Sequence, residues 1–135
     1  MVTLQEVYAL FLVSSGVETD SRKSLSNKLF FALKGQNFDG NTYALSALEK
    51  GAKAAIVDSS EIAATHQNCY LVDNVLQTLQ SLANHHRNQF DIPVIALTGS
   101  NGKTTTKELI TAALSSTHRV LATKGNLNNH IGVPL

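Results

Sequence analysis

The stretch ALTGSNGKTTTKEL, residues 96–109, constrains the fold more than any other part of the chain. It overlaps the apolar run IPVIAL (92–97), whose length and composition predict a parallel strand covered on both faces. It leads into a helical pattern at 103–116, and RVLAT (119–123) predicts another strand. The inward positions expected on this helix are Leu109, Ile110, Ala113 and Leu114. A strand, a glycine turn and a helix in this order indicate an α/β fold.

The glycine turn has the residue types of a phosphate-binding loop. A turn at a helix N-terminus presents unpaired backbone N–H groups and the positive end of the helix dipole, which favour phosphate oxygens. Gly99 and Gly102 allow the close approach that this requires. Lys103 can reach the outer phosphates, and Thr104 can offer its hydroxyl to Mg²⁺. The candidate nucleotide-binding residues are Gly99, Ser100, Asn101, Gly102, Lys103, Thr104 and Thr105.

This loop departs from the strict pattern G-x-x-x-x-G-K-[ST], because Leu97 stands where the first glycine of that pattern belongs. The alternative interpretation is a turn whose glycines only join a strand to a helix. Lys103 would then be solvated, and the threonines would cap the helix. The strand expected before the loop and the helix expected after it favour phosphate binding.

The first ninety residues show the same alternation of strands and helices. The expected helices lie at 3–13, 42–50, 61–65 and 75–90. The expected strands lie at 29–33, 54–57 and 69–72. Asp91, Ile92 and Pro93 mark a natural boundary. We therefore expect an α/β protein with a small mixed-sheet domain at 1–91, followed at 92–135 by the opening strand, loop, helix and strand of a phosphate-loop domain.

Composition excludes several classes of protein. The formal net charge of +1 argues against a broad nucleic-acid surface. No apolar run reaches the roughly 18 residues that a membrane span requires, and the N-terminus has no signal-peptide pattern, so we expect a cytoplasmic protein. The single cysteine, Cys69, cannot form an internal disulfide and is expected to be buried.

Four stretches together resemble the Mur ligases, the ATP-dependent amide-forming enzymes of bacterial peptidoglycan synthesis. They are TDSR (19–22), LFFALKGQNFDGNTY (29–43), TGSNGKTTTKE (98–108) and TKGNLNNHIGVPL (123–135). Within the family they are most similar to the member that joins D-alanyl-D-alanine to UDP-MurNAc-tripeptide. The resemblance implies that the first domain binds the UDP-linked substrate and that the second opens the central ATP-binding domain. Where the family usually has a glycine and an acidic residue, this chain has Asn27 and Lys28.

The resemblance also implies roles for residues outside the glycine loop. The implied substrate-binding residues are Ser21, Arg22, Gln36, Asn37, Phe38, Asn129 and His130. A hydroxyl and a guanidinium suit a diphosphate, amides suit the edge of uracil, and a ring can pack on a base or sugar. Each group of residues also has an interpretation without a ligand. Ser21 and Arg22 would lie in a surface turn in which Asp20 pairs with Arg22, and residues 36–41 would form a solvated loop. Asn129 and His130, with Asn128, would lie in a loop held by its own side-chain to backbone hydrogen bonds.

The implied reaction uses Mg-ATP. The γ-phosphoryl group passes to the terminal carboxylate of UDP-MurNAc-tripeptide, and the amine of D-alanyl-D-alanine attacks the resulting acyl phosphate. Lys103 and Mg²⁺ on Thr104 would supply the catalytic positive charge. We expect a monomer with no nucleic-acid or membrane partner.

The sequence ends before the family's acidic metal ligand, modified lysine and C-terminal domain, so we expect no turnover from these 135 residues alone. The open alternatives are a Mur ligase that adds the third amino acid, a folylpolyglutamate-synthase-like enzyme, a non-catalytic UDP-sugar-binding module, and a P-loop kinase or GTPase.

Overall fold

The computed structural model describes residues 1–127 and 129–135, which fall into two compact units. The sheet unit comprises Met1–Gln89 with Pro134–Leu135, and the glycine-loop unit comprises Phe90–Val133. The units divide after Gln89, whereas the sequence led us to expect a division after Asp91. Asn128 lies outside the described residues.

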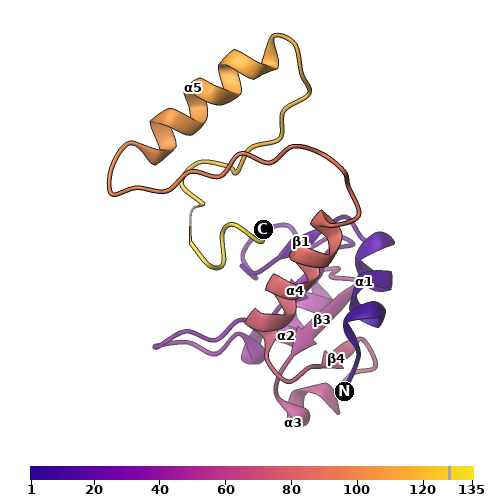
Figure 1. Ribbon diagram of the computed structural model, residues 1–135. Helices are drawn as coiled ribbons and strands as arrows, with labels where there is room; N and C mark the ends of the chain where they lie inside the picture. The colour runs from indigo at the N-terminus through magenta and orange to yellow at the C-terminus, as the bar shows by residue number, and fades with distance from the viewer. Residues whose placement is uncertain (128) are drawn as a thin grey trace. The chain divides into compact units, whose positions relative to one another are not determined.

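Four parallel strands form the sheet, in the order β1-β2-β3-β4 (Figure 1). They are β1 (Val17–Glu18), β2 (Leu29–Phe31), β3 (Ala54–Val57) and β4 (Cys69–Leu71). The α/β class is confirmed. The sheet is parallel at every described pair rather than mixed, because each connection returns the chain to the same end of the sheet before the next strand begins. Sequence patterns did not predict β1, which is only two residues long.

Helices cover both faces of this sheet. They are α1 (Leu4–Leu12), the 3-10 helix η1 (Gly40–Tyr43), α2 (Ala44–Glu49), α3 (Ser60–Ala63) and α4 (Val75–Arg87). Helices α2 and α3 pack against β3, whereas α1 packs on α4, which contacts β2. Phe30, Ala55 and Val57 share one apolar cluster with residues of α2. Since strand side chains alternate in direction, buried Leu29, Phe31 and Ile56 face the opposite layer.

Two residues with positive φ shape the turns around the sheet. Gly51 has φ 92° and follows Lys50, the C-cap of α2, which is the position where a left-handed glycine commonly ends a helix. Asn27 has φ 56°, in the left-handed region that asparagine adopts more readily than other non-glycine residues. Asparagine therefore fits the position where the resemblance led us to expect glycine.

In the glycine-loop unit, α5 (Lys103–Ser115) forms close to its expected bounds, but the strands expected at 92–97 and 119–123 do not form. Val94 is 62% and Ile95 60% exposed. Leu109, expected to point inward, is 67% exposed, and no residue of α5 is buried. These predictions were wrong because a strand needs neighbouring strands to bond its backbone, and an apolar helix face is buried only against another element.

No helix of the described residues is long and apolar enough to cross a membrane.

Candidate functional site

Two loops that carry predicted substrate residues emerge at one edge of the sheet. Strands β1 and β2 are adjacent and parallel, so the segments that follow them leave at the same, carboxyl edge. We call residues 19–22 the β1 turn and residues 34–39 the β2 hairpin. The β1 turn carries Ser21 and Arg22, and the β2 hairpin carries Gln36, Asn37 and Phe38. Open parallel sheets place their ligands at this edge.

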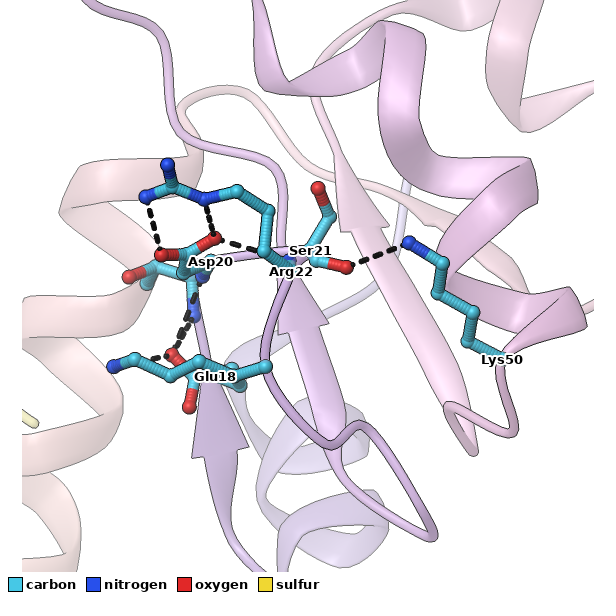
Figure 2. Close-up of polar contacts among 7 residues, drawn as sticks. Glu18, Asp20, Ser21, Arg22 and Lys50 are labelled. Atoms are coloured by element: carbon cyan, nitrogen blue, oxygen red, sulfur yellow. Dashed lines mark hydrogen bonds and ion pairs between the residues drawn. The ribbon is translucent and has the colours of Figure 1, made fainter.

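Glu18 holds the β1 turn from below (Figure 2). It is 8% exposed, and its Oε1 accepts hydrogen bonds from the backbone N–H groups of Thr19 (3.1 Å) and Asp20 (3.2 Å). The Lys23 ammonium lies 3.4 Å from the same oxygen. Burial opposes ionisation, but the Asp20 and Thr19 N–H groups and Lys23 outweigh it and hold the pKa of Glu18 below its ordinary value. A buried carboxylate therefore fixes the backbone of the turn.

Asp20 and Arg22 form a bidentate pair across the β1 turn (Figure 2). Arg22 donates from Nε to Oδ1 (2.8 Å) and from Nη2 to Oδ2 (2.7 Å). The side-chain and backbone N–H groups of Arg22 bring the pKa of Asp20 far below its ordinary value. This is the pairing that the plain interpretation of the turn expected. It uses two of the five guanidinium donors and leaves three for a ligand.

Lys50 reaches the same turn from the end of α2 (Figure 2). Its ammonium donates to the backbone carbonyl of Ser21 at 2.9 Å. Neither Lys50 nor Glu18 was among the predicted site residues. The position of Glu18 directly before TDSR could have suggested its role, whereas nothing in the sequence pairs Lys50 with Ser21.

The β2 hairpin projects from the sheet unit (purple in Figure 1). An isolated antiparallel bridge joins Lys34 to Asp39, and the N–H of Gly35 donates to the carbonyl of Phe38 at 2.9 Å. The ring of Phe38 lies so close to Gly35 that a Cβ there would overlap it, yet the residue is 58% exposed. Gln36 and Asn37 are also exposed. The tip thus presents a ring and two amides.

The glycine loop ends at the N-terminus of α5. Gly102, the N-cap, has φ 77°, Gly99 has φ 145°, and no side chain caps this helix end. The first N–H groups of a helix have no partner within the helix, so the N-terminus of α5 can bind an anion. The Lys103 ammonium donates to the carbonyl of Gly99 at 2.6 Å, and Thr104 and Thr105 are exposed. These residues fit nucleotide phosphates.

Lys107 joins α5 to the loop that follows the second expected strand. Its ammonium donates to the carbonyls of Thr123 (2.6 Å) and Gly125 (2.8 Å) and lies 2.9 Å from a Glu108 carboxylate oxygen. The Lys107 side chain is only 16% exposed.

The predicted residues near the C-terminus are placed less favourably for a ligand. Oδ1 of Asn129 accepts from the N–H groups of Ile131 (3.1 Å) and Gly132 (2.7 Å), so this side chain holds its own loop. His130 is exposed in that loop. Among the residues that the structure describes, no three His, Cys, Asp or Glu side chains gather as metal ligands.

A parallel α/β unit and a glycine-capped helix define the broad class, an α/β protein with a loop of the nucleotide-binding type. The chain belongs to the Mur ligase family. The family model described as "Mur ligase family, catalytic domain" matches residues 14–87, more than half of the chain, and "Mur ligase middle domain" matches residues 97–135. The membership expected from the motifs is confirmed.

Curated relatives and solved structures agree with this membership. The UDP-N-acetylmuramoyl-tripeptide--D-alanyl-D-alanine ligase of Bacillus subtilis (strain 168) is 45% identical over 124 residues, which are 91% of this chain and 27% of that protein. The protein of the same name from Escherichia coli (strain K12) is 39% identical over 130 residues, 96% of this chain and 28% of that protein.

Among solved structures, MurF from Acinetobacter baumannii matches with a TM-score of 0.82 and 34% identity, over 98% of this chain and 31% of that chain. MurF ligase from Thermotoga maritima in complex with ADP matches with a TM-score of 0.79 and 33% identity, over 91% and 28%. The chain thus spans less than a third of the length of each of these proteins.

Proposed function

We propose that this chain contributes the UDP-substrate-binding loops and the ATP-binding loop of a ligase that joins D-alanyl-D-alanine to UDP-MurNAc-tripeptide through an acyl phosphate. The observation that carries the proposal is that the β1 turn and the β2 hairpin emerge at one edge of a parallel sheet. The relatives named for this reaction support it. We further propose a cytoplasmic, monomeric protein.

At the sheet edge, the chain would bind the UDP part of the substrate. Ser21 and the three remaining N–H donors of Arg22 would bind the diphosphate, because a guanidinium matches phosphate oxygens. The amides of Gln36 and Asn37 would bond the edge of uracil, and Phe38 would pack on the base or sugar. Glu18 and Lys50 keep the β1 turn in the conformation that this needs.

At the N-terminus of α5, the chain would bind ATP. Bound ATP supplies the phosphoryl group that activates the substrate carboxylate, and Mg²⁺ would screen its phosphates. The backbone N–H groups at 103–105 would bind phosphate oxygens, and the Lys103 ammonium would turn from the Gly99 carbonyl toward the transferred charge. The Thr104 hydroxyl would serve as a ligand of this Mg²⁺.

Asn129 and His130 would lie near the sugar or the peptide of the substrate. Since Oδ1 of Asn129 already accepts two backbone bonds, its side-chain NH₂ group is what it would offer a ligand.

A chimera tests the reaction. These 135 residues replace the matching segment of the Bacillus subtilis relative, and phosphate release is measured with ATP, UDP-MurNAc-tripeptide and D-alanyl-D-alanine. We expect release that depends on both substrates. Lys103→Ala should lower kcat at least about 100-fold, because one preorganised donor to a developing negative charge is lost. Binding of the UDP-linked substrate should not change.

Lys53→Ala, which removes a lysine outside both loops, serves as the control for this experiment. ADP formation without phosphate release would indicate a kinase instead, and phosphate release that needs neither substrate would indicate an ordinary ATPase. Unchanged release by Lys103→Ala would contradict the role of the glycine loop.

A non-catalytic UDP-sugar-binding module is the second candidate. It is favoured by one observation, that the described apolar core lies in the sheet unit whereas no residue of α5 is buried. Calorimetry on the 135-residue chain separates the two functions: binding of UDP-MurNAc-tripeptide but not of ATP, together with an inactive chimera, would favour the module.

A further inference from the structure

Asn41 is a buried amide at the base of the β2 hairpin. It lies on η1, two residues after the hairpin ends, and is 2% exposed. Its Nδ2 donates to Oδ1 of Asp39 (2.7 Å) and to Oδ1 of Asp58 (2.8 Å). Its Oδ1 accepts from the backbone N–H of Asp58 at 3.1 Å. Both donor hydrogens and the acceptor oxygen of this side chain are therefore used.

These bonds tie both legs of the hairpin to the end of one strand. Asp58 directly follows β3, a strand whose four residues are all buried. The leg that ends at Asp39 reaches Asp58 through Asn41, and the leg that begins at Lys34 reaches it by an ion pair of 2.8 Å. Two legs fixed to one rigid point leave the hairpin little freedom to swing.

Charge and packing strengthen the attachment. Burial opposes ionisation of Asp58, but the bonds from Lys34 and Asn41 outweigh it and hold the pKa of Asp58 below its ordinary value. Asp58 is therefore a carboxylate at neutral pH. Gly40, beside Asn41, passes so close to the end of β2 that a Cβ there would overlap the backbone of Ala32 and Leu33.

We infer that Asn41 is a positioning residue for nucleotide-sugar recognition, because it holds the β2 hairpin in the orientation that presents Phe38 and the tip amides to uracil. The inference rests on the function proposed above. A loop that is already ordered binds more tightly, since binding does not have to order it. Asn41 is buried beneath the hairpin base and acts through the hairpin tip rather than on the ligand.

The test is calorimetry of UDP binding to the 135-residue chain, as a double-mutant cycle. Asn41→Ala should weaken UDP binding about tenfold, the equivalent of the ordering cost of one or two side chains. In a Phe38→Ala background, the same change should weaken binding only about threefold, because the ring that Asn41 positions is gone and only the tip amides remain. Asn88→Ala removes an exposed amide at the end of α4 and should not change the affinity.

Lys34→Met is a second variant in case Asn41→Ala fails to fold. It removes only the ion pair that attaches the leg beginning at Lys34 to Asp58, and it should weaken UDP binding about threefold. A folded Asn41→Ala chain that binds UDP normally would overturn the inference. Equal weakening with and without Phe38 would also overturn it, since Asn41 would then act on the fold generally. If the unmodified chain fails to bind UDP, the proposed function fails as well.

Discussion

Glu18 and Asn41 are the buried polar side chains of the described residues, and both support loops at the carboxyl edge of the sheet. A polar group loses water when it is buried and is tolerated only when its hydrogen bonds are replaced. Here the replacements come from the β1 turn, from the base of the β2 hairpin and from the end of β3. The desolvation cost in this unit is thus concentrated beneath the loops that we propose bind the substrate.

At the scale of the residue, the lowered pKa of Glu18 predicts a stability change in acid. The carboxylate stabilises the fold above the unfolded pKa, about 4.3, and this contribution is lost as the pH falls through the lower folded pKa. Glu18→Gln should lower the free energy of unfolding of the sheet unit by about 1–2 kcal/mol at pH 7 and make it fall less between pH 6 and pH 3. Urea titration followed by circular dichroism measures both values.

Glu49→Gln, a change at an exposed carboxylate at the end of α2, is the matched control. The role given to Glu18 would be wrong if the two variants had the same stability at neutral pH and the same loss in acid.

At the scale of the element, helices were easier to predict than strands, because their signals are local. Helix α1 begins with a capping box: Thr3 Oγ1 accepts from the N–H of Glu6 at 3.3 Å, and the N–H of Thr3 donates to Glu6 Oε2 at 2.7 Å. The residues of a capping box lie within four positions of the sequence, so the beginning of such a helix can be recognised from the sequence alone. The apolar run at 92–97, by contrast, has the composition of a strand, but it forms one only if neighbours supply hydrogen bonds.

The residues of the candidate site likewise fall into those that short motifs predict and those that they do not. The residues of the β1 turn, the β2 hairpin and the glycine loop could be named from short motifs. Glu18, directly before TDSR, could have been suggested as a support. The supporting roles of Asn41 and Lys50 could not, because their partners are distant in sequence: Asn41 and Asp58 are 17 residues apart, and Ser21 and Lys50 are 29 residues apart. Only folding brings such pairs together.

The capping box gives a prediction about α1. Thr3→Ala should lower the free energy of unfolding of the sheet unit by about 1 kcal/mol, because the N–H of Glu6 loses its acceptor. Thr3→Ser keeps the hydroxyl and should restore most of that loss. Thermal or urea unfolding of the three chains gives the comparison, and an equal loss in both variants would show that the Thr3 methyl group, not the cap, is what matters.

At the scale of the whole molecule, the two units differ in burial. Every residue of β2 and β3 is buried, whereas no residue of α5 is. An isolated helix of 13 residues is only marginally stable in water, since packing supplies most helix stability in proteins. The two units should therefore open with different free energies.

Hydrogen exchange measured by mass spectrometry tests this difference. Amides of β2 and β3 should exchange at least about 100-fold more slowly than those of α5, because their exchange requires the core to open. Comparable protection of α5 and β3 would show that packing stabilises α5 as it does the sheet.

Cys69, on β4, is the one cysteine of the sequence and is 7% exposed, and burial raises the pKa of its thiol. A maleimide dye needs the thiolate, so it should label the native chain slowly and react as soon as this strand is uncovered. The rate of alkylation then serves as a clock for the sheet unit alone, because Phe90–Val133 carries no sulfhydryl that could contribute to the signal.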